Sequence, residues 1–244
     1  MAIERVESLP PPHRFTVEEY FAFEKASEFK HEYIDGVIYD WGDPDPDAPV
    51  HPDYVPGYPM PHLFTVEEYL AFESRSEFKH EFIDGVIYDM TGGTYHHSGI
   101  KVNITVELGI QLRNRSYSVR NSDMSVRVGA SRYVYTDVSV VRGQPELEDD
   151  DTTLLNPILT VEVLSPTTED YDRSTKLRYY QALPSLQCCL IVEQFDMRVD
   201  VYIRANDSWR HQRYDSSDDI IQLPMLDCQL PLAEIYRGIS FESA

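Results

Sequence analysis

Three acidic residues set in apolar segments are the first candidates for chemistry in this sequence. Glu81 directly precedes the run FIDGVIY, Asp137 lies within YVYTDVSVV, and Glu162 lies within ILTVEVLS. A carboxylate in such surroundings is costly to bury unless it is paired or coordinates a cation. Mg²⁺ prefers oxygen ligands, and a bound metal can activate water for attack on a phosphodiester. The three residues therefore predict a metal-dependent hydrolysis site. For each residue singly, the alternative is a strand-end salt bridge.

Four further residues are candidates for the same site. Lys176 follows the Glu162 segment on a predicted helix, where its amine would offset phosphate charge. His97 follows a glycine-rich turn at the start of a predicted helix, and Asn103 lies further along it, so both could contact the substrate. The alternatives are a capping or packing histidine and an interior hydrogen-bonding asparagine. Arg127 lies four residues after Asp123, and the two residues either line the site edge or pin neighbouring loops.

Charge narrows the choice of partner. The chain carries 42 acidic and 21 basic residues, a net charge of −21, which disfavours attraction of nucleic acid to the whole surface. Residues 91–142 are the exception, with 7 basic and 3 acidic side chains. We interpret this segment as a local surface for DNA. The alternative is that its arginines neutralise the acidic flanks.

The sequence lacks the motifs of several other classes of protein. Neither GxGxxG nor GxxxxGK[ST] occurs, and no GxSxG elbow is present, so nucleotide-binding and serine-hydrolase functions have no support. The three cysteines lack metal-ligand spacing and are expected to be buried thiols. No stretch approaches the roughly 20 apolar residues of a membrane span, and MAIERVESLPPPHRF lacks the apolar core of a signal peptide. We therefore expect a cytoplasmic protein without membrane contact.

Helices and strands alternate around the candidate residues. Ile100, Ile104 and Leu108 have helical spacing and predict a helix over 97–113. A second helix is expected over 170–182. Short β-rich runs predict strands at 117–121, 124–128, 133–141, 158–164, 188–193, 198–204 and 209–214. This alternation indicates an α/β fold.

A long repeat occupies the first third of the chain. Residues 12–40 and 61–89 are identical at 24 of 29 positions, and each copy predicts a helix with a capping box followed by a strand. Residues 43–61 contain seven prolines in nineteen positions, which is typical of an extended linker. We therefore divide the chain into a partial duplicate (1–41), a linker (42–61) and the main domain (62–244).

Both copies are suited to the same place in a sheet. The second copy is contiguous with the downstream domain, so placing the first copy there would cost loop-closure entropy without adding contacts. We expect the second copy to occupy the sheet. The first copy then packs at the periphery, swaps into another chain to form a homodimer, or stays loose.

The order of the motifs resembles the Uma family of restriction-endonuclease-like proteins, within the PD-(D/E)XK nuclease superfamily. The resemblance covers about three quarters of the chain, residues 62–240, and rests on an ordered series of segments. They are FIDGVIYDMTGG with His97 and Asn103, SDMSVRV, YTDVSVV, VEVLSPTTEDYDRSTKLRYY, PSLQCCLIV and LPLAEIY.

The resemblance implies a mixed sheet flanked by helices and matches family acidic residues to Glu81, Asp137 and Glu162. Thr136 stands where the family motif has proline, and Leu164 occupies its lysine slot. Related proteins often carry the lysine in the next helix, where Lys176 lies. The resemblance thus implies an Mg²⁺-dependent endonuclease acting on DNA, with Mn²⁺ as an alternative metal. The competing hypothesis is a catalytically inactive nuclease fold that serves as a binding or scaffold module, which Leu164 and the acidic charge favour.

Overall fold

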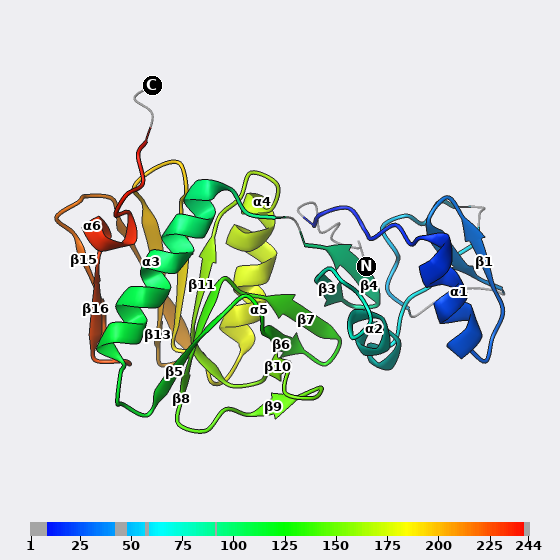
Figure 1. Cartoon of the computed structure of the whole chain (residues 1–244), viewed down its shortest axis with the longest axis horizontal. Helices are drawn as coiled ribbons and strands as arrows, with labels where there is room; N and C mark the ends of the chain where they lie inside the picture. Colours follow the sequence, from blue (N-terminus) through cyan, green and yellow to red (C-terminus); the bar gives the residue numbers. More distant parts are fainter. Residues whose placement is uncertain (1–8, 42–47, 57–58, 91, 242–244) are drawn as a thin grey trace. The chain divides into compact units, whose positions relative to one another are not determined.

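The computed structural model describes residues 9–41, 48–56, 59–90 and 92–241. They form two compact units (Figure 1). The N-terminal unit contains residues 10–91 and 129–134, and the C-terminal unit contains residues 92–128 and 135–244. The second copy of the repeat therefore shares a unit with the first copy. No helix among the described residues has the length and apolar character needed to cross a bilayer.

A mixed six-stranded sheet is the centre of the C-terminal unit. Its order is β14-β13-β12-β11-β8-β5, in which β11 and β12 are parallel and the other neighbours are antiparallel. The strands are β5 (Tyr117–Asn121), β8 (Val138–Arg142), β11 (Pro157–Val163), β12 (Cys188–Val192), β13 (Val199–Ala205) and β14 (Ser208–Tyr214). Strands β8, β11 and β12 are almost entirely buried, as expected of central strands covered on both faces.

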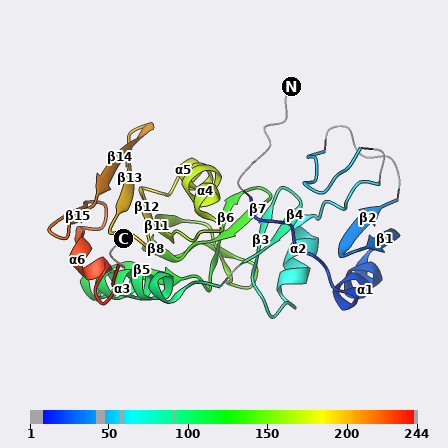
Figure 2. The same ribbon diagram turned by 90° about the horizontal axis from the view of Figure 1, so that it is seen from above.

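Helices cover both faces of this sheet (Figure 2). The long helix α3 (Tyr95–Gln111) lies on one face. The other face carries α4 (Glu169–Tyr171), the π-helical segment η1 (Asp172–Lys176) and α5 (Leu177–Ala182). The smaller elements of the unit are β6 (Ser125–Gly129), β9 (Leu147–Glu148), β10 (Thr153–Leu154), β15 (Ile220–Leu223), β16 (Cys228–Pro231) and α6 (Leu232–Ile235).

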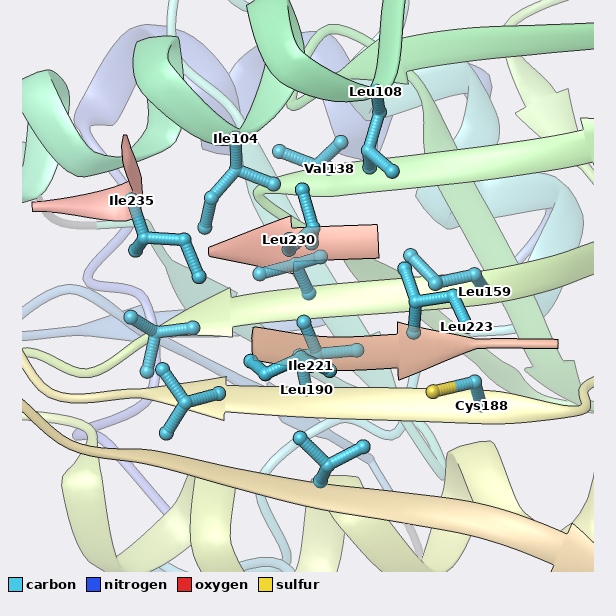
Figure 3. Close-up of a cluster of buried hydrophobic side chains, with 14 of the residues drawn as sticks. Ile104, Leu108, Val138, Leu159, Cys188, Leu190, Ile221, Leu223, Leu230 and Ile235 are labelled. Carbon is cyan, nitrogen blue, oxygen red and sulfur yellow. The ribbon is translucent and has the colours of Figure 1, made fainter. Parts of the chain in front are cut away.

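The main core lies between α3 and the sheet. Ile100, Ile104 and Leu108 recur at helical spacing and are fully buried, so they fix the face that α3 turns inward. Figure 3 shows Ile104 and Leu108 beside Val138 of β8, with residues of β15 and β16 completing the cluster. Burial of this apolar surface, at about 25 cal/mol per Å², fixes α3 against the ends of the strands that carry the acidic residues.

The N-terminal unit contains the same structure twice. The first copy forms α1 (Val17–Ala26), β1 (His31–Ile34) and β2 (Val37–Asp40). The second forms α2 (Val66–Glu73), β3 (His80–Ile83) and β4 (Val86–Asp89), and β3 also pairs with β7 (Arg132–Tyr135). Both helices start with a capping box. Both hairpins turn at Asp-Gly with positive φ at each residue, which a tight two-residue hairpin turn requires.

The segments that precede the two helices are exchanged between the copies. We call residues 12–15 arm 1 and residues 61–64 arm 2. The N–H of His13 in arm 1 donates to Ile87 of the second copy, and that of His62 in arm 2 donates to Ile38 of the first, both at 2.8 Å. Each arm then returns to its own copy, since Phe15 N–H donates to Gly36 at 2.9 Å, with an equivalent bond at Phe64. The first copy is therefore packed against the second copy by reciprocal arms.

Two predicted elements differ from the structure. The strand expected over 133–141 is broken into β7 and β8, because the Thr136 hydroxyl donates to the carbonyls of Val138 and Val161. The helix expected over 170–182 is present as α4 and α5, but the π-helical segment η1 interrupts it between them. The hairpin β15–β16 and helix α6 had no counterpart among the predicted elements. The linker is described only at 48–56 and 59–61, so the prediction for its remaining residues falls outside the described chain.

Candidate active site

Asp137 lies directly before β8, and two basic side chains of α3 face its carboxylate. His97 Nε2 is 3.1 Å from Asp137 Oδ2, and Lys101 Nζ is 3.6 Å from Oδ1. The backbone N–H of Val163, on the neighbouring strand β11, donates to Oδ2 at 2.8 Å. His97 and Lys101 are four residues apart on a helix, so they lie on one face and reach the same carboxylate.

These contacts determine the charge state of Asp137. Burial raises the pKa of its carboxyl group, but the hydrogen bond and charge of His97, the Val163 N–H and Lys101 together outweigh burial. The net result is a pKa below the ordinary value for aspartate. The structure thus holds an ionised carboxylate in a largely buried position, which is the state a cation ligand requires.

Glu162 lies on β11, and the other face of the sheet supplies its partners. Lys176 Nζ is 3.4 Å from Glu162 Oε1, and the Tyr180 hydroxyl donates to the same oxygen. Burial raises the pKa of Glu162 well above its ordinary value. Lys176 and Tyr180 oppose this shift, and the charges of Asp172 and Asp137 reinforce it. Asp137 and Glu162 are therefore close enough to repel each other electrostatically.

The π-helical segment positions the lysine. Lys176 is the last residue of η1, and its amine donates to the Tyr135 carbonyl at 2.8 Å while lying 3.7 Å from Asp172 Oδ1. The side chain is buried, and a buried amine is costly unless polar partners surround it. The oxygens of Tyr135, Asp172 and Glu162 are those partners. Short π-helical segments inside helices often occur at functional sites.

Comparison with known proteins identifies the family. Residues 66–233 match the Uma2 family, which is described as "Putative restriction endonuclease". The chain belongs to the Uma2 family. The match confirms the resemblance inferred from the ordered motifs. The matched residues include Asp137, Glu162 and Lys176.

Two relatives come from Synechocystis sp. and are described as uncharacterized. The protein slr1290 is 37% identical over 236 residues, covering 96% of this Uma2 chain and 97% of the relative. The protein sll1609 is 33% identical over 120 residues, covering 48% of this chain and 68% of the relative.

A solved structure from Anabaena variabilis shares the fold. It is described as a putative nuclease belonging to DUF820, with a TM-score of 0.60 and 18% identity. The match covers 71% of this Uma2 chain and 97% of the Anabaena chain. The predicted restriction-endonuclease-like mixed α/β fold is thereby confirmed.

The remaining predicted site residues have other surroundings. Glu81 lies buried on β3 in the N-terminal unit, opposite Tyr88, and its part in the metal site of this Uma2 protein stays a prediction. The Asn103 amide donates to the carbonyls of Ile235 and Arg237, and so ties α3 to the end of α6.

Arg127 pairs with Glu148 at 2.7 Å and ties β6 to β9. The contacts of Asn103 and Arg127 described here join elements of the fold. These contacts match the structural alternatives stated above, an interior hydrogen-bonding asparagine and an arginine that pins neighbouring loops.

Three site residues were not singled out from the sequence. Lys101 lies one helical turn after His97, and Tyr180 lies one turn after Lys176. Asp172 is four residues before Lys176 and accepts a hydrogen bond from Thr168 at 2.6 Å. The four-residue spacing from a named candidate on a predicted helix is the signal that would have found all three.

The donor set of this Uma2 site fits a hard divalent cation. Asp137 and Glu162 supply carboxylate oxygens, the ligands that Mg²⁺ and Mn²⁺ prefer. Burial and the negative charge of Asp137 both disfavour the ionised form of Glu162. The positive charge of a bound cation would favour that ionised form. That Asp137 and Glu162 together hold a metal ion stays a prediction.

Proposed function

We propose that this Uma2 protein is an Mg²⁺-dependent endonuclease that hydrolyses DNA phosphodiester bonds, with Mn²⁺ as an alternative metal. The observation that carries the proposal is the placement of Asp137, directly before β8, next to the strand β11 that carries Glu162, with the Lys176 amine 3.4 Å from Glu162 Oε1. A bound divalent cation would supply Lewis acidity toward the phosphate and lower the pKa of water.

The side chains divide the remaining work. Asp137 and Glu162 would hold the metal, and Glu81 is proposed to position water or support the ligands. Lys176 would stabilise negative charge that develops on the phosphate or on the attacking water. The Lys176 amine takes the place of a lysine at position 164, where the buried Leu164 cannot carry charge. His97 would keep Asp137 ionised through its contact with Oδ2.

Exposed arginines support DNA as the substrate. Arg113, Arg120 and Arg142 are exposed, and Arg120 lies on β5 at the end of the strand nearer Asp137. Phosphate contacts of this kind can bind DNA locally although the chain carries a net charge of −21. We place the reaction in the cytoplasm, as inferred from the sequence.

Cleavage of supercoiled plasmid in Mg²⁺ tests the proposal. The full chain should nick or linearise plasmid in Mg²⁺ but not in excess chelator, and Asp137→Ala should reduce cleavage to background. Lys25→Ala, at an exposed position on α1, is the control and should cleave like the parent. A parent protein that binds DNA but leaves it intact in both Mg²⁺ and Mn²⁺ would instead support the binding or scaffold module.

A further inference from the structure

The arms carry a second set of metal-ligand residues, remote in sequence from Asp137 and Glu162. Cluster A consists of His13, His80 and Asp89, and cluster B consists of His62, His31 and Asp40. In each cluster one ligand atom per residue lies within 4.8 Å of the others. Cluster B is cluster A with the roles of the two copies interchanged, since arm 1 supplies His13 to the second copy and arm 2 supplies His62 to the first.

The distances in the two clusters agree closely. In cluster A, Asp89 Oδ1 lies 2.5 Å from His13 Nδ1 and 3.5 Å from His80 Nε2. In cluster B, Asp40 Oδ1 lies 2.6 Å from His62 Nδ1 and 3.6 Å from His31 Nε2. One carboxylate oxygen and two imidazole nitrogens therefore converge on one point in each copy.

Glutamates hold the outer nitrogens of the imidazoles. His80 Nδ1 is 2.8 Å from Glu73 Oε2, and His31 Nδ1 is 2.9 Å from Glu24 Oε2. The capping-box residues Glu19 and Glu68 face the Nε2 atoms of the arm histidines, at 3.4 and 3.3 Å. A histidine that binds metal through one nitrogen and is held by a carboxylate at the other is the usual arrangement of a protein metal site.

The hydrogen bonds leave a position for a cation. Because Glu73 can only accept, the Nδ1 of His80 must donate, and in a neutral ring Nε2 then carries a lone pair. That lone pair faces Asp89 Oδ1, which is also an acceptor. The same holds for His31 and Asp40. Two acceptors that face each other are stabilised only when a proton or a metal ion lies between them.

The surroundings favour a metal ion with a partly open coordination shell. Phe72 packs against both histidines of cluster A, with ring centroids 5.4 and 4.8 Å away, and Phe23 does the same in cluster B at 5.0 and 4.8 Å. The histidines are mostly buried, whereas the Asp89 side chain is 57% exposed. An exposed aspartate can close onto an ion, and solvent can supply the fourth ligand.

None of the ligands and outer glutamates differs between the copies. The five differences in the repeat fall at residues 14, 21, 25, 26 and 33 of the first copy and at their counterparts in the second. We propose that clusters A and B each bind one divalent transition-metal ion of the zinc class, through two histidines, one aspartate and a water molecule. Each ion then clamps an arm to the hairpin of the other copy.

Zinc titration of the metal-free full chain tests this proposal. The parent for the experiment carries Asp137→Ala, so that the nuclease site contributes no carboxylate pair. Calorimetry with ZnCl₂ should give two ions per chain, one for each cluster. Asp89→Asn and Asp40→Asn should each remove one ion, and the double variant should remove both. His211→Asn is the matched control, because His211 faces a single aspartate, Asp200, at 2.7 Å.

Two outcomes would overturn the clamp: a parent that binds no zinc, or a double variant that binds as much as the parent. Co²⁺ added to the unaltered clusters gives a readout that depends on no substitution. Strong visible absorption of tetrahedral cobalt supports the sites, and the weak spectrum of the hydrated ion contradicts them. Zinc should also raise the melting temperature of the parent but not of the double variant. None of these readouts depends on DNA cleavage.

Discussion

Lys176 is the residue whose chemistry is least apparent from its position in the sequence. The family motif has a lysine at the position of Leu164, yet the amine that lies 3.4 Å from Glu162 Oε1 belongs to Lys176, on the following helical segment. The amine also contacts the Tyr135 carbonyl and Asp172, so its place is fixed from three sides. We infer that an amine delivered from a helix can do the work of one delivered from the strand.

Replacement of Lys176 should separate catalysis from folding. Lys176→Met keeps the length of the side chain but removes the charge, so we expect the cleavage rate to fall by about 10²- to 10³-fold. DNA binding should change little, because the amine is buried. Plasmid-cleavage rates and fluorescence-anisotropy binding would measure the two effects, with Lys25→Met as the control.

A variant that cleaves at the parental rate would exclude Lys176 from the chemistry. Circular dichroism would check that the fold survives, since Glu162 loses one partner and keeps Tyr180.

The acidic residues of the candidate site were predictable because burial of a carboxylate is costly. Asp137 and Glu162 stand out as charges between β-branched residues, and the strands they mark are present. Their partners were less predictable. Whether His97 caps a helix or faces a carboxylate depends on how α3 crosses the sheet, and this in turn depends on apolar packing far from His97. Single-residue reasoning cannot determine that packing.

At the scale of elements, the strongly periodic segments agree with their predictions and the interruptions do not. The helix expected over 97–113 is present as α3, and the strand expected over 158–164 as β11. The break before β8 coincides with the hydrogen bonds of Thr136, and η1 ends at the buried Lys176, and neither feature changes the apolar pattern. Hydrophobic periodicity carries no information about either feature.

Asn103 gives a test at the level of elements. Its amide joins α3 to the carbonyls that end α6, so Asn103→Ala should destabilise the protein by about 1–3 kcal/mol through two lost hydrogen bonds. Chemical denaturation would measure this loss. The KM for DNA should remain at the parental value. If KM rises while stability is unchanged, Asn103 contacts the substrate, as the sequence had suggested.

At the scale of the whole molecule, the repeat was visible in the sequence but the exchange of its arms was not. Both copies have the same pattern of apolar residues, so the sequence is equally consistent with each arm binding its own copy. The exchange rests on backbone hydrogen bonds between each arm and the hairpin of the other copy, which no residue pattern specifies. The sequence left three fates open for the first copy, and in the described residues the first copy bonds to the second through the reciprocal arms.

Truncation of the first copy should change the assembly state. Removing residues 1–60 leaves arm 2 without its acceptor hairpin and leaves β4 without arm 1. Arm 2 of one truncated chain can bind the β3–β4 hairpin of another, at the place that arm 1 occupies in the full chain. Two truncated chains should therefore exchange arms and form a dimer, whereas the full chain makes both contacts internally. Light scattering after size-exclusion chromatography would give the masses.

Removal of residues 1–64 is the matched control, because it also deletes arm 2 and should leave a monomer. A truncated chain that remains monomeric with arm 2 present would show that the arm does not drive association.

The reciprocal bonds of His13 and His62 also bear on how the N-terminal unit loses its structure. Tandem modules ordinarily melt one after another, each at its own temperature. Here neither hairpin keeps its full set of backbone partners once the other has opened, so the two near-identical halves are bound to melt as one cooperative block.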